Sequence, residues 1–276
     1  MPEMPEVEII RRSLDKSLAG RTVMKVDIIL PRQIKWPDTE TFRALLTGHK
    51  FSRAERVGKF LILVMDNGAE LVVHLRMTGH LVYHASKDDG DKYARIRFLL
   101  DNGAVLTYGD ARTLGAVYAL KKGERQRIKA LAEMGAEPLS EEFTAEYLKN
   151  VCAGRKITIK QLILEQKSVG GVGNIYADEA LFAAKIFPGK QAAELTDCEL
   201  TRLRDAINKV IAAGIEDGGT TFRDYQNAEG KKGNHQENLF VYARNGQKCR
   251  LCGETIKKIT VGGRGTHFCP RCQGEA

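Results

Sequence analysis

Four cysteines near the end of the chain constrain its fold more than any other feature. They form two C-x-x-C knuckles, at Cys249 and Cys252 and at Cys269 and Cys272, with the spacing of a tetrahedral zinc site. Four thiolates leave no open coordination position, so the expected metal is one structural zinc ion. The pattern therefore predicts a small zinc-finger module in a reducing compartment.

The segment between the two knuckles is basic, because it carries Lys257, Lys258 and Arg264. Cations on a hairpin held by zinc favour binding to an anion such as the phosphate backbone of a nucleic acid. A zinc ribbon that only fastens the end of the chain stays open as an alternative at this point.

Length and charge fit this interpretation. A chain of 276 residues with 43% hydrophobic content can bury two cores, so we expect two main domains with the zinc module attached to the second. The formal charge of +8 and the pI of about 9.1 favour a polyanionic partner, although many cytosolic proteins share such a balance. No secretion signal is evident, and the longest apolar run, Phe60 to Met65, is too short for a bilayer, so we expect a cytoplasmic protein without a membrane role.

The N-terminal half has the periodicity of a helix followed by strands. A helix is expected from about Pro5 to Gly20, and its buried face consists of Val7, Ile10, Leu14 and Leu18. Strand patterns run from Thr22 to about Lys121, with hairpin turns at residues 66–68 and 101–103. This half is therefore predicted to be an antiparallel β-sandwich.

The second half is predicted to be helical. Gly and Pro break the strand pattern at residues 134–140, and helical periodicity then continues to about Glu216. Thr196 and Glu199 form a predicted capping box for the last long helix. The expected fold is α+β and multidomain, with divisions at residues 1–133, 134–238 and 239–276.

A glycine-rich segment, Gly170 to Asn174, separates two of the predicted helices. With Asn174 as N-cap, free backbone N–H groups at the helix start would form a phosphate site. A plain helix–helix turn that needs glycine is the alternative on this segment alone. Lys156, Lys160 and the basic zinc hairpin make the phosphate interpretation the better one.

The N-terminus contains a candidate nucleophile. Removal of Met1 would expose the secondary amine of Pro2, and an α-amino group has a pKa near ~8, against ~10.4 for lysine. Such an amine attacks an aldehyde-level carbon to give an iminium, and Glu3 and Glu6 are close enough in sequence to act as acid or base. Pro5 and Glu6 also begin a helix well, but that does not explain Pro2 and Glu3.

These residues belong to motifs that extend over nearly the whole chain. The motifs are Pro2-Glu3-x-Pro5-Glu6-Val7-Glu8, Gly58-Lys59, His74-Leu75-Arg76-Met77-Thr78-Gly79, Asp110-Ala111-Arg112, Gly171-Val172-Gly173-Asn174-Ile175-Tyr176 and Gly263-Arg264-Gly265-Thr266-His267-Phe268-Cys269-Pro270-x-Cys272-Gln273. In these motifs the sequence resembles the formamidopyrimidine-DNA glycosylases, bacterial enzymes that excise oxidised purines and then cut the strand. The resemblance implies a β-sandwich, a helix-two-turn-helix domain and a zinc finger, with DNA bound in the cleft between them.

The resemblance also implies roles for single residues. Pro2 corresponds to the nucleophile that attacks C1′ of the damaged nucleotide, Glu3 to the acid that assists opening of the sugar ring, and Glu6 to a support of the lesion pocket. Phosphate contacts are implied for Lys59, His74, Asn174 and Arg264. Lys156 and Tyr176 are expected to belong to the DNA-binding residues as well.

A flipped lesion leaves a space in the duplex, and Met77, Arg112 and Leu114 stand where the family fills it. A core methionine is the plainer interpretation of Met77. Residues 217–238, including Gly218-Gly219-Thr220-Thr221-Phe222-Arg223-Asp224-Tyr225, resemble the loop that closes over the flipped base, with Thr220 as the candidate backbone contact. A disordered surface loop would have the same composition.

Three departures from the family pattern are visible. Leu114 replaces the usual aromatic wedge, Tyr93-Ala94-Arg95 replaces a histidine-containing stretch, and Gln161 stands where a proline often follows the lysine. Arg95 could compensate for the lost histidine or face solvent.

The sequence therefore predicts a monomeric, bifunctional glycosylase and AP lyase that acts on double-stranded DNA carrying 8-oxoguanine or formamidopyrimidines, with β,δ-elimination. Two alternatives remain at this point: an endonuclease VIII-like enzyme for oxidised pyrimidines, which Leu114 leaves open, and a damaged-DNA binding protein without turnover.

Overall fold

The computed structural model describes residues 2–85, 90–221, 228, 230 and 233–274. The chain divides into two compact units. Unit 1 consists of Met1–Ala132 together with Asp217–Gln236, and unit 2 consists of Glu133–Glu216 together with Glu237–Ala276. Residues 217–236, which lie within the predicted second domain, thus pack with the N-terminal unit.

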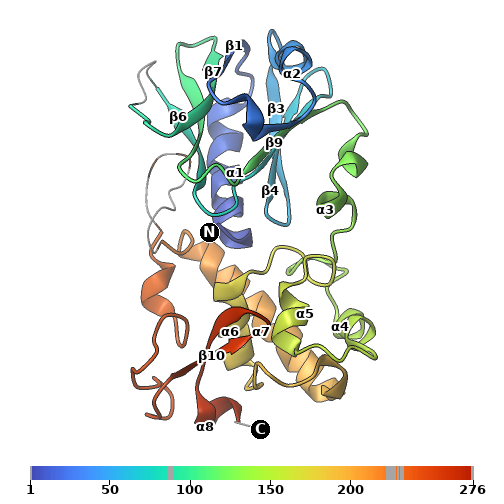
Figure 1. Cartoon of the computed structure of the whole chain (residues 1–276), viewed down its shortest axis with the longest axis vertical. Coiled ribbons are helices and arrows are strands. Elements are labelled where there is room, and N and C mark those ends of the chain that lie inside the picture. Colours follow the sequence, from blue (N-terminus) through green and yellow to red (C-terminus); the bar gives the residue numbers. More distant parts are fainter. Residues whose placement is uncertain (1, 86–89, 222–227, 229, 231–232, 275–276) are drawn as a thin grey trace. The chain divides into compact units, whose positions relative to one another are not determined.

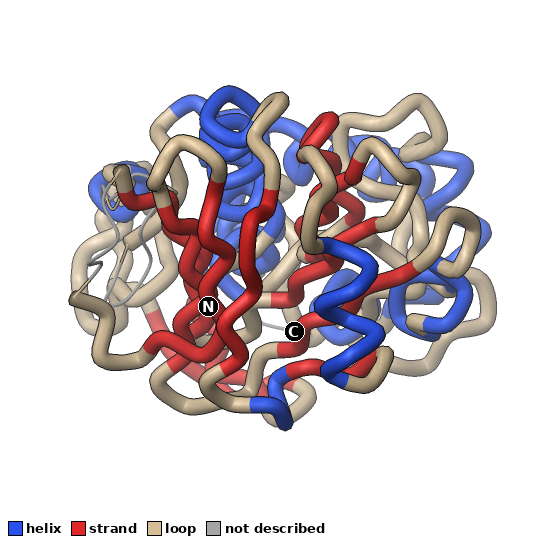
Figure 2. Tube along the Cα trace, turned by 90° about the horizontal axis from the view of Figure 1, so that it is seen from above, coloured by secondary structure: helices blue, strands red, loops and turns tan. Residues whose placement is uncertain are grey.

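Unit 1 contains two β-sheets, whose strands form two groups in Figure 2. The four-stranded sheet has the order β1-β7-β8-β6, and the five-stranded sheet has the order β2-β9-β5-β4-β3. All pairings are antiparallel except β2 with β9, so the predicted antiparallel sandwich has one parallel pair. The strands are β1 (Val23–Ile28), β2 (Ile34–Trp36), β3 (Phe51–Val57), β4 (Phe60–Met65), β5 (Glu70–His74), β6 (Gly79–His84), β7 (Ala94–Leu100), β8 (Val105–Asp110) and β9 (Ala116–Leu120).

Both predicted hairpin turns are confirmed. Residues 66–68 join β4 to β5, and residues 101–103 join β7 to β8. Gly68 and Gly103 have φ values of +79° and +82°, the left-handed conformation that glycine adopts without steric cost. The turns set a register in which side chains of both sheets contribute to one hydrophobic core.

Helix α1 (Met4–Leu18) passes alongside strands of both sheets (Figure 1). The predicted apolar face is confirmed, because Val7, Ile10, Leu14 and Leu18 are all buried. Two further helices, α2 (Thr39–Leu46) and α3 (Lys129–Ala132), complete the regular helices of this unit.

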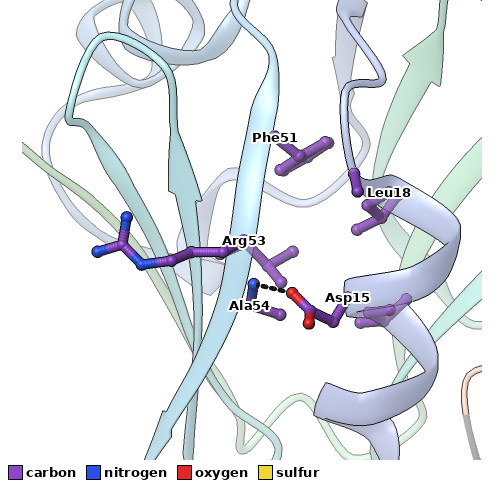
Figure 3. A pocket seen from close by; sticks show the side chains of 8 residues that line it. Asp15, Leu18, Phe51, Arg53 and Ala54 are labelled. Carbon is purple, nitrogen blue, oxygen red and sulfur yellow. Dashed lines mark hydrogen bonds between the residues drawn. The ribbon is translucent and has the colours of Figure 1, made fainter.

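Helix α1 runs antiparallel to β3, and side-chain contacts fix this direction. Asp15 Oδ1 accepts a 2.7 Å hydrogen bond from Ala54 N, beside the packed side chains of Leu18 and Phe51 (Figure 3). Glu8, two turns nearer the helix start, accepts from Arg56 Nε at 3.2 Å. Because earlier helix residues face later strand residues, the start of α1 lies toward the turn between β3 and β4.

Unit 2 consists of helices and one hairpin. Its elements are α4 (Ala145–Cys152), α5 (Ile159–Leu164), α6 (Asn174–Ala183), α7 (Asp197–Glu216), β10 (Lys257–Val261), β11 (Arg264–Phe268) and α8 (Pro270–Gln273). The predicted capping box precedes α7: Thr196 N donates to Glu199 Oε2 at 2.9 Å, and Glu199 N donates to Thr196 Oγ1 at 3.3 Å. Helices α6 and α7 pack against each other (Figure 1).

Among the described residues, no helix has the length and apolar character needed to cross a membrane.

Candidate functional site

The start of α1 forms a buried acidic cluster in unit 1. Pro2, Glu3 and Glu6 are all buried. Glu6 Oε2 accepts a 2.8 Å hydrogen bond from Glu3 N, and Glu6 Oε1 accepts a 2.7 Å hydrogen bond from Thr220 N. One carboxylate therefore joins the candidate acid to the first residues of the candidate capping loop.

The two ends of that loop, residues 217–221 and 233–236, are joined to each other by hydrogen bonds and form its stem. His235 Nδ1 lies 2.8 Å from Asp217 Oδ2, and Gly233 N donates to Thr221 Oγ1 at 2.9 Å. The N–H of Thr220, the predicted contact to the flipped base, is occupied by Glu6. Met1 and the loop residues 222–225 lie outside the described residues, so the predictions made for them are not tested.

Lys59 and His74 lie at one end of the five-stranded sheet. Lys59 directly precedes β4, and Phe60 is paired with His74 across β4 and β5, with their rings 4.6 Å apart. Because the start of α1 lies toward this same turn, the candidate nucleophile, acid and both basic groups belong to one region of unit 1.

His74 is a neutral hydrogen-bond donor. Burial, followed by the charges of Arg76 and Lys59, lowers the pKa of His74 to about 3. Its Nδ1 accepts a 3.1 Å hydrogen bond from Arg76 N, so the imidazole proton is on Nε2. That N–H suits a phosphate oxygen and keeps the same protonation state at any physiological pH.

We call the three predicted space-filling residues, Met77, Arg112 and Leu114, the wedge. Arg112 Nη1 approaches Met77 Sδ at 3.4 Å. Met77 and Leu114 are 44% and 49% exposed, so the interpretation of Met77 as a core residue is wrong. Each follows a residue in the left-handed conformation, Arg76 (φ 53°) or Thr113 (φ 54°), which turns the chain outward.

Asn174 and Arg264 come together in unit 2. Asn174 is the first residue of α6 and its N-cap is Gly173, so the prediction of Asn174 as N-cap is wrong. The side chain instead donates from Nδ2 to the Gly265 carbonyl at 3.0 Å, beside the exposed Arg264 at the start of β11. Lys156 is also exposed.

Two residues expected to contribute to phosphate or DNA binding are buried instead. Lys160 is fully buried, with Nζ 2.5 Å from Asp178 Oδ1 and 2.8 Å from Thr266 Oγ1, so it is not a phosphate ligand. Tyr176 is likewise fully buried, and a Cβ added at Gly214 would lie 2.5 Å from its ring. The Tyr176 side chain therefore packs α6 against α7 and is not available to DNA.

Two departures from the family pattern have structural roles. Arg95 donates from Nε to the Asp110 carbonyl at 3.0 Å, so it binds the end of β8 and does not simply face solvent. Gln161 closes a capping box with Thr158, a function that requires the backbone N–H absent from proline. The carboxylates of Asp110 and Asp178 are contacts that sequence reasoning missed, since only their burial in the fold distinguishes them from surface acids.

The four cysteines meet the geometric requirements of a zinc site. Their sulfur atoms all lie within 4.8 Å of one another, with Cys249 to Cys272 at 3.9 Å and Cys252 to Cys269 at 3.4 Å. Four sulfurs at ~2.3 Å from a tetrahedral zinc are ~3.8 Å apart, so these positions fit the metal. The hairpin between them is β10 paired with β11, with Lys257 and Lys258 exposed.

Comparisons with known proteins agree with this geometry. Residues 1–117 match the model of the formamidopyrimidine-DNA glycosylase N-terminal domain, residues 134–226 match the corresponding H2TH domain, and residues 246–274 match the zinc finger found in FPG and IleRS. The chain is 44% identical over 273 residues to the formamidopyrimidine-DNA glycosylase of Symbiobacterium thermophilum, covering 99% of this chain and 89% of that protein. It is 44% identical over 274 residues to that of Desulforamulus reducens, covering 99% of each.

Solved structures show the same similarity. A Lactococcus lactis FPG variant in complex with DNA containing Fapy-dG aligns with a TM-score of 0.93 at 33% identity, covering 99% of this chain and 100% of that chain. The MutM (FPG) protein of Thermus thermophilus aligns with a TM-score of 0.90 at 37% identity, covering 100% of both chains.

The expected fold is confirmed by these matches, as is one structural zinc ion held by the four cysteines. Family models match the N-terminal domain, the H2TH domain and the zinc finger, and relatives are 44% identical over nearly the full length. The chain therefore belongs to the formamidopyrimidine-DNA glycosylase family.

Proposed function

We propose that this protein excises oxidised purines, 8-oxoguanine and formamidopyrimidines, from double-stranded DNA and then cleaves the strand as an AP lyase. The observation that carries the proposal is the buried cluster at the start of α1, where Glu6 links Glu3 to Thr220 beside Pro2. A nucleophile and carboxylates at the entrance of a helix, next to the stem of a loop, suit covalent attack on a nucleotide turned out of the duplex.

The reaction begins at the nitrogen of Pro2. After removal of Met1, the amine attacks C1′, the bond from C1′ to the base breaks, and the base leaves with a proton. Glu3 donates a proton to the sugar ring oxygen as the ring opens, and an iminium forms between Pro2 and C1′. Loss of a proton from C2′ expels the 3′ phosphate, a second elimination expels the 5′ phosphate, and water releases the sugar fragment from Pro2.

The remaining site residues are proposed to position the DNA. Lys59 and the Nε2–H of His74 bind phosphates near the reacting sugar, and Asn174, Arg264 and Lys156 bind phosphates from unit 2. The zinc ion holds the β10–β11 hairpin that presents Arg264. Glu6 supports the lesion pocket through Thr220, while Tyr176 acts only by packing beneath the DNA-binding surface.

The wedge fills the space left by the flipped nucleotide, with Arg112 placed against the orphaned base. Leu114 can unstack a base step as an aliphatic wedge. Because it is not the usual aromatic residue, activity on oxidised pyrimidines is an alternative that the trapping experiment below also tests.

We further propose a monomer with functional divisions at residues 1–133, 134–238 and 239–276. We also propose that the enzyme works in the bacterial cytoplasm, on the nucleoid through its DNA substrate; the bacterial origin of the relatives named above supports this proposal.

Borohydride trapping tests the proposal, because hydride reduction of the iminium fixes the protein to the DNA. A duplex with 8-oxoguanine opposite cytosine should give a covalent band that Pro2→Gly, or retention of Met1, abolishes. Trapping only with thymine glycol would assign the enzyme to oxidised pyrimidines. Trapping only at a preformed abasic site would leave a lyase, and no trapping would leave a DNA-binding protein.

A further inference from the structure

Asp110, the last residue of β8, has no exposed surface and lies two residues before Arg112 of the wedge. Its Oδ1 accepts hydrogen bonds from Thr78 Oγ1 at 2.6 Å and from Arg112 N at 3.2 Å. Its Oδ2 accepts from Gly115 N at 2.8 Å, with Gln33 Nε2 and Tyr108 Oη each at 3.4 Å. A buried carboxylate is tolerated only when donors surround it in this way.

Three of these donors, from Thr78, Arg112 and Gly115, come from the two segments that carry the wedge. Thr78 lies between β5 and β6, next to Met77, whereas Arg112 and Gly115 lie between β8 and β9, on either side of Leu114. Thr78 Oγ1 also accepts from Arg112 N at 3.1 Å. The side chains of Asp110 and Thr78 therefore join the two segments to each other.

Other contacts hold Asp110 itself in place. Arg95 Nε binds the Asp110 carbonyl at 3.0 Å, and Asp110 N donates to the Tyr93 carbonyl at 3.0 Å. A Cβ added at Gly115 would collide with the hydroxyl of Tyr108 and would approach Asp110 Oδ2 at 3.2 Å. The carboxylate thus sits in a closed, fully packed position.

The wedge segments need such support because their backbone is strained. Thr113 is β-branched and adopts φ 54°, and Arg76 adopts φ 53°; a left-handed residue other than glycine persists only where its surroundings hold it.

We infer that Asp110 is a positioning residue that acts through Thr78 and through the backbone N–H groups of Arg112 and Gly115 to fix Met77, Arg112 and Leu114 as one rigid wedge. This inference rests on the proposed function. Asp110 does not touch the substrate: it keeps the two wedge segments in register so that they enter the duplex together. Its loss should therefore impair extrusion of a lesion from paired DNA while sparing the chemistry at Pro2.

The test compares two substrates under single-turnover conditions. The first is a duplex with 8-oxoguanine opposite cytosine, which must be opened. The second is a single-stranded oligonucleotide with an abasic site, which has no partner strand to replace. The variants are Asp110→Asn, Thr78→Val and, as the conservative replacement, Thr78→Ser.

Asp110→Asn should lower the duplex excision rate at least ~10-fold, since one of the two donor-facing oxygens becomes an NH₂ group. Thr78→Val, which removes a single hydroxyl, should lower it several-fold, and Thr78→Ser should restore it. All three variants should cleave the single-stranded abasic site within about twofold of the unmodified protein, because each retains Pro2 and Glu3.

Asp15→Asn is the matched control. Asp15 also accepts a hydrogen bond from a backbone N–H of unit 1, that of Ala54, but this bond joins α1 to β3 and not the two wedge segments (Figure 3). It should leave the ratio of the two rates unchanged.

Equal losses on both substrates would overturn the inference, since they would reveal general destabilisation. Unchanged duplex excision by Thr78→Val and Asp110→Asn would overturn it as well. If Asp110→Asn does not fold, Thr78→Val and Thr78→Ser decide the question alone. An unmodified protein that cleaves neither substrate would instead reject the proposed function.

Discussion

Replacement of Lys160 by methionine should destabilise unit 2, because Lys160 and Asp178 join its helices to the zinc hairpin. Lys160 and Asp178 are both fully buried and form a 2.5 Å ion pair. Asp178 Oδ2 also accepts from His267 N at 2.8 Å, two residues before the zinc ligand Cys269. Lys160→Met keeps most of the aliphatic volume but leaves the Asp178 carboxylate buried without its cation.

The expected magnitude follows from this burial. Removing one partner of a buried ion pair costs about 3–5 kcal/mol, because the remaining charge cannot be hydrated. With a urea dependence of about 2 kcal/mol per molar, the unfolding midpoint of unit 2 should fall by roughly 1.5–2.5 M. Lys149→Met is the matched control, because its pair with Asp197 is 50% and 74% exposed and should contribute less than about 1 kcal/mol.

The chain provides separate probes for its two units. Trp36 is the single tryptophan and lies in unit 1, so its fluorescence reports unfolding of that unit. A chromophoric chelator reports zinc release, and therefore unit 2. Lys160→Met should shift the zinc-release midpoint more than the Trp36 midpoint.

Zinc release by Lys160→Met at the same urea concentration as the unmodified protein would refute the reasoning. The double variant Lys160→Met with Asp178→Leu, which removes the stranded charge, should recover part of the lost stability.

Four further predictions concern other parts of the chain. The folded-state pKa of His74 is about 3, against 6.5 for an ordinary histidine. The contribution of His74 to stability is therefore present above pH 6.5 and is lost as the pH falls from about 6.5 toward 3. Between pH 7 and 5, His74→Gln should lose less stability than the unmodified protein, as measured by urea midpoints. Leu114→Phe should increase, and Leu114→Gly decrease, the rate of lesion excision from duplex DNA, as measured in single turnovers, because the wedge residue is exposed and apolar. Thr113→Asn should raise the free energy of unfolding of unit 1, followed by Trp36 fluorescence, by about 1 kcal/mol, since asparagine adopts the left-handed conformation more readily. An unchanged or lower free energy of unfolding would contradict the strain argument. Chelation of zinc should weaken binding to a duplex with a stable abasic analogue by at least ~10-fold, measured by fluorescence anisotropy, while Trp36 emission stays constant.

Features set by local sequence were predicted well. The first helix, the two glycine turns and the Thr196–Glu199 capping box depend on residues within a few positions of one another. The cysteine spacing similarly predicted the zinc site, because the ligands of each knuckle are close in sequence.

Features set by distant contacts were missed or misassigned. Lys160 was grouped with surface cations because its partner Asp178 is on another helix and Thr266 is on the zinc hairpin. Tyr176 was included in the DNA-binding set because its motif implied a surface role, while only the packing of α6 on α7 shows that it is buried. Asp110 stood within a recognised motif but received no role until its donors from separate segments were visible.

The hydrogen bond between Thr220 N and Glu6 Oε1 also has a consequence for synthesis of the chain. The two residues are 214 positions apart, and unit 2 begins between them. At translation rates of about 5–20 residues per second, roughly 10–40 s pass between them. Once β9 has been synthesised, the nascent protein contains its first helix and all strands of both sheets but not the second segment of unit 1. The acidic cluster at the N-terminus is therefore completed only after residue 220 has been added.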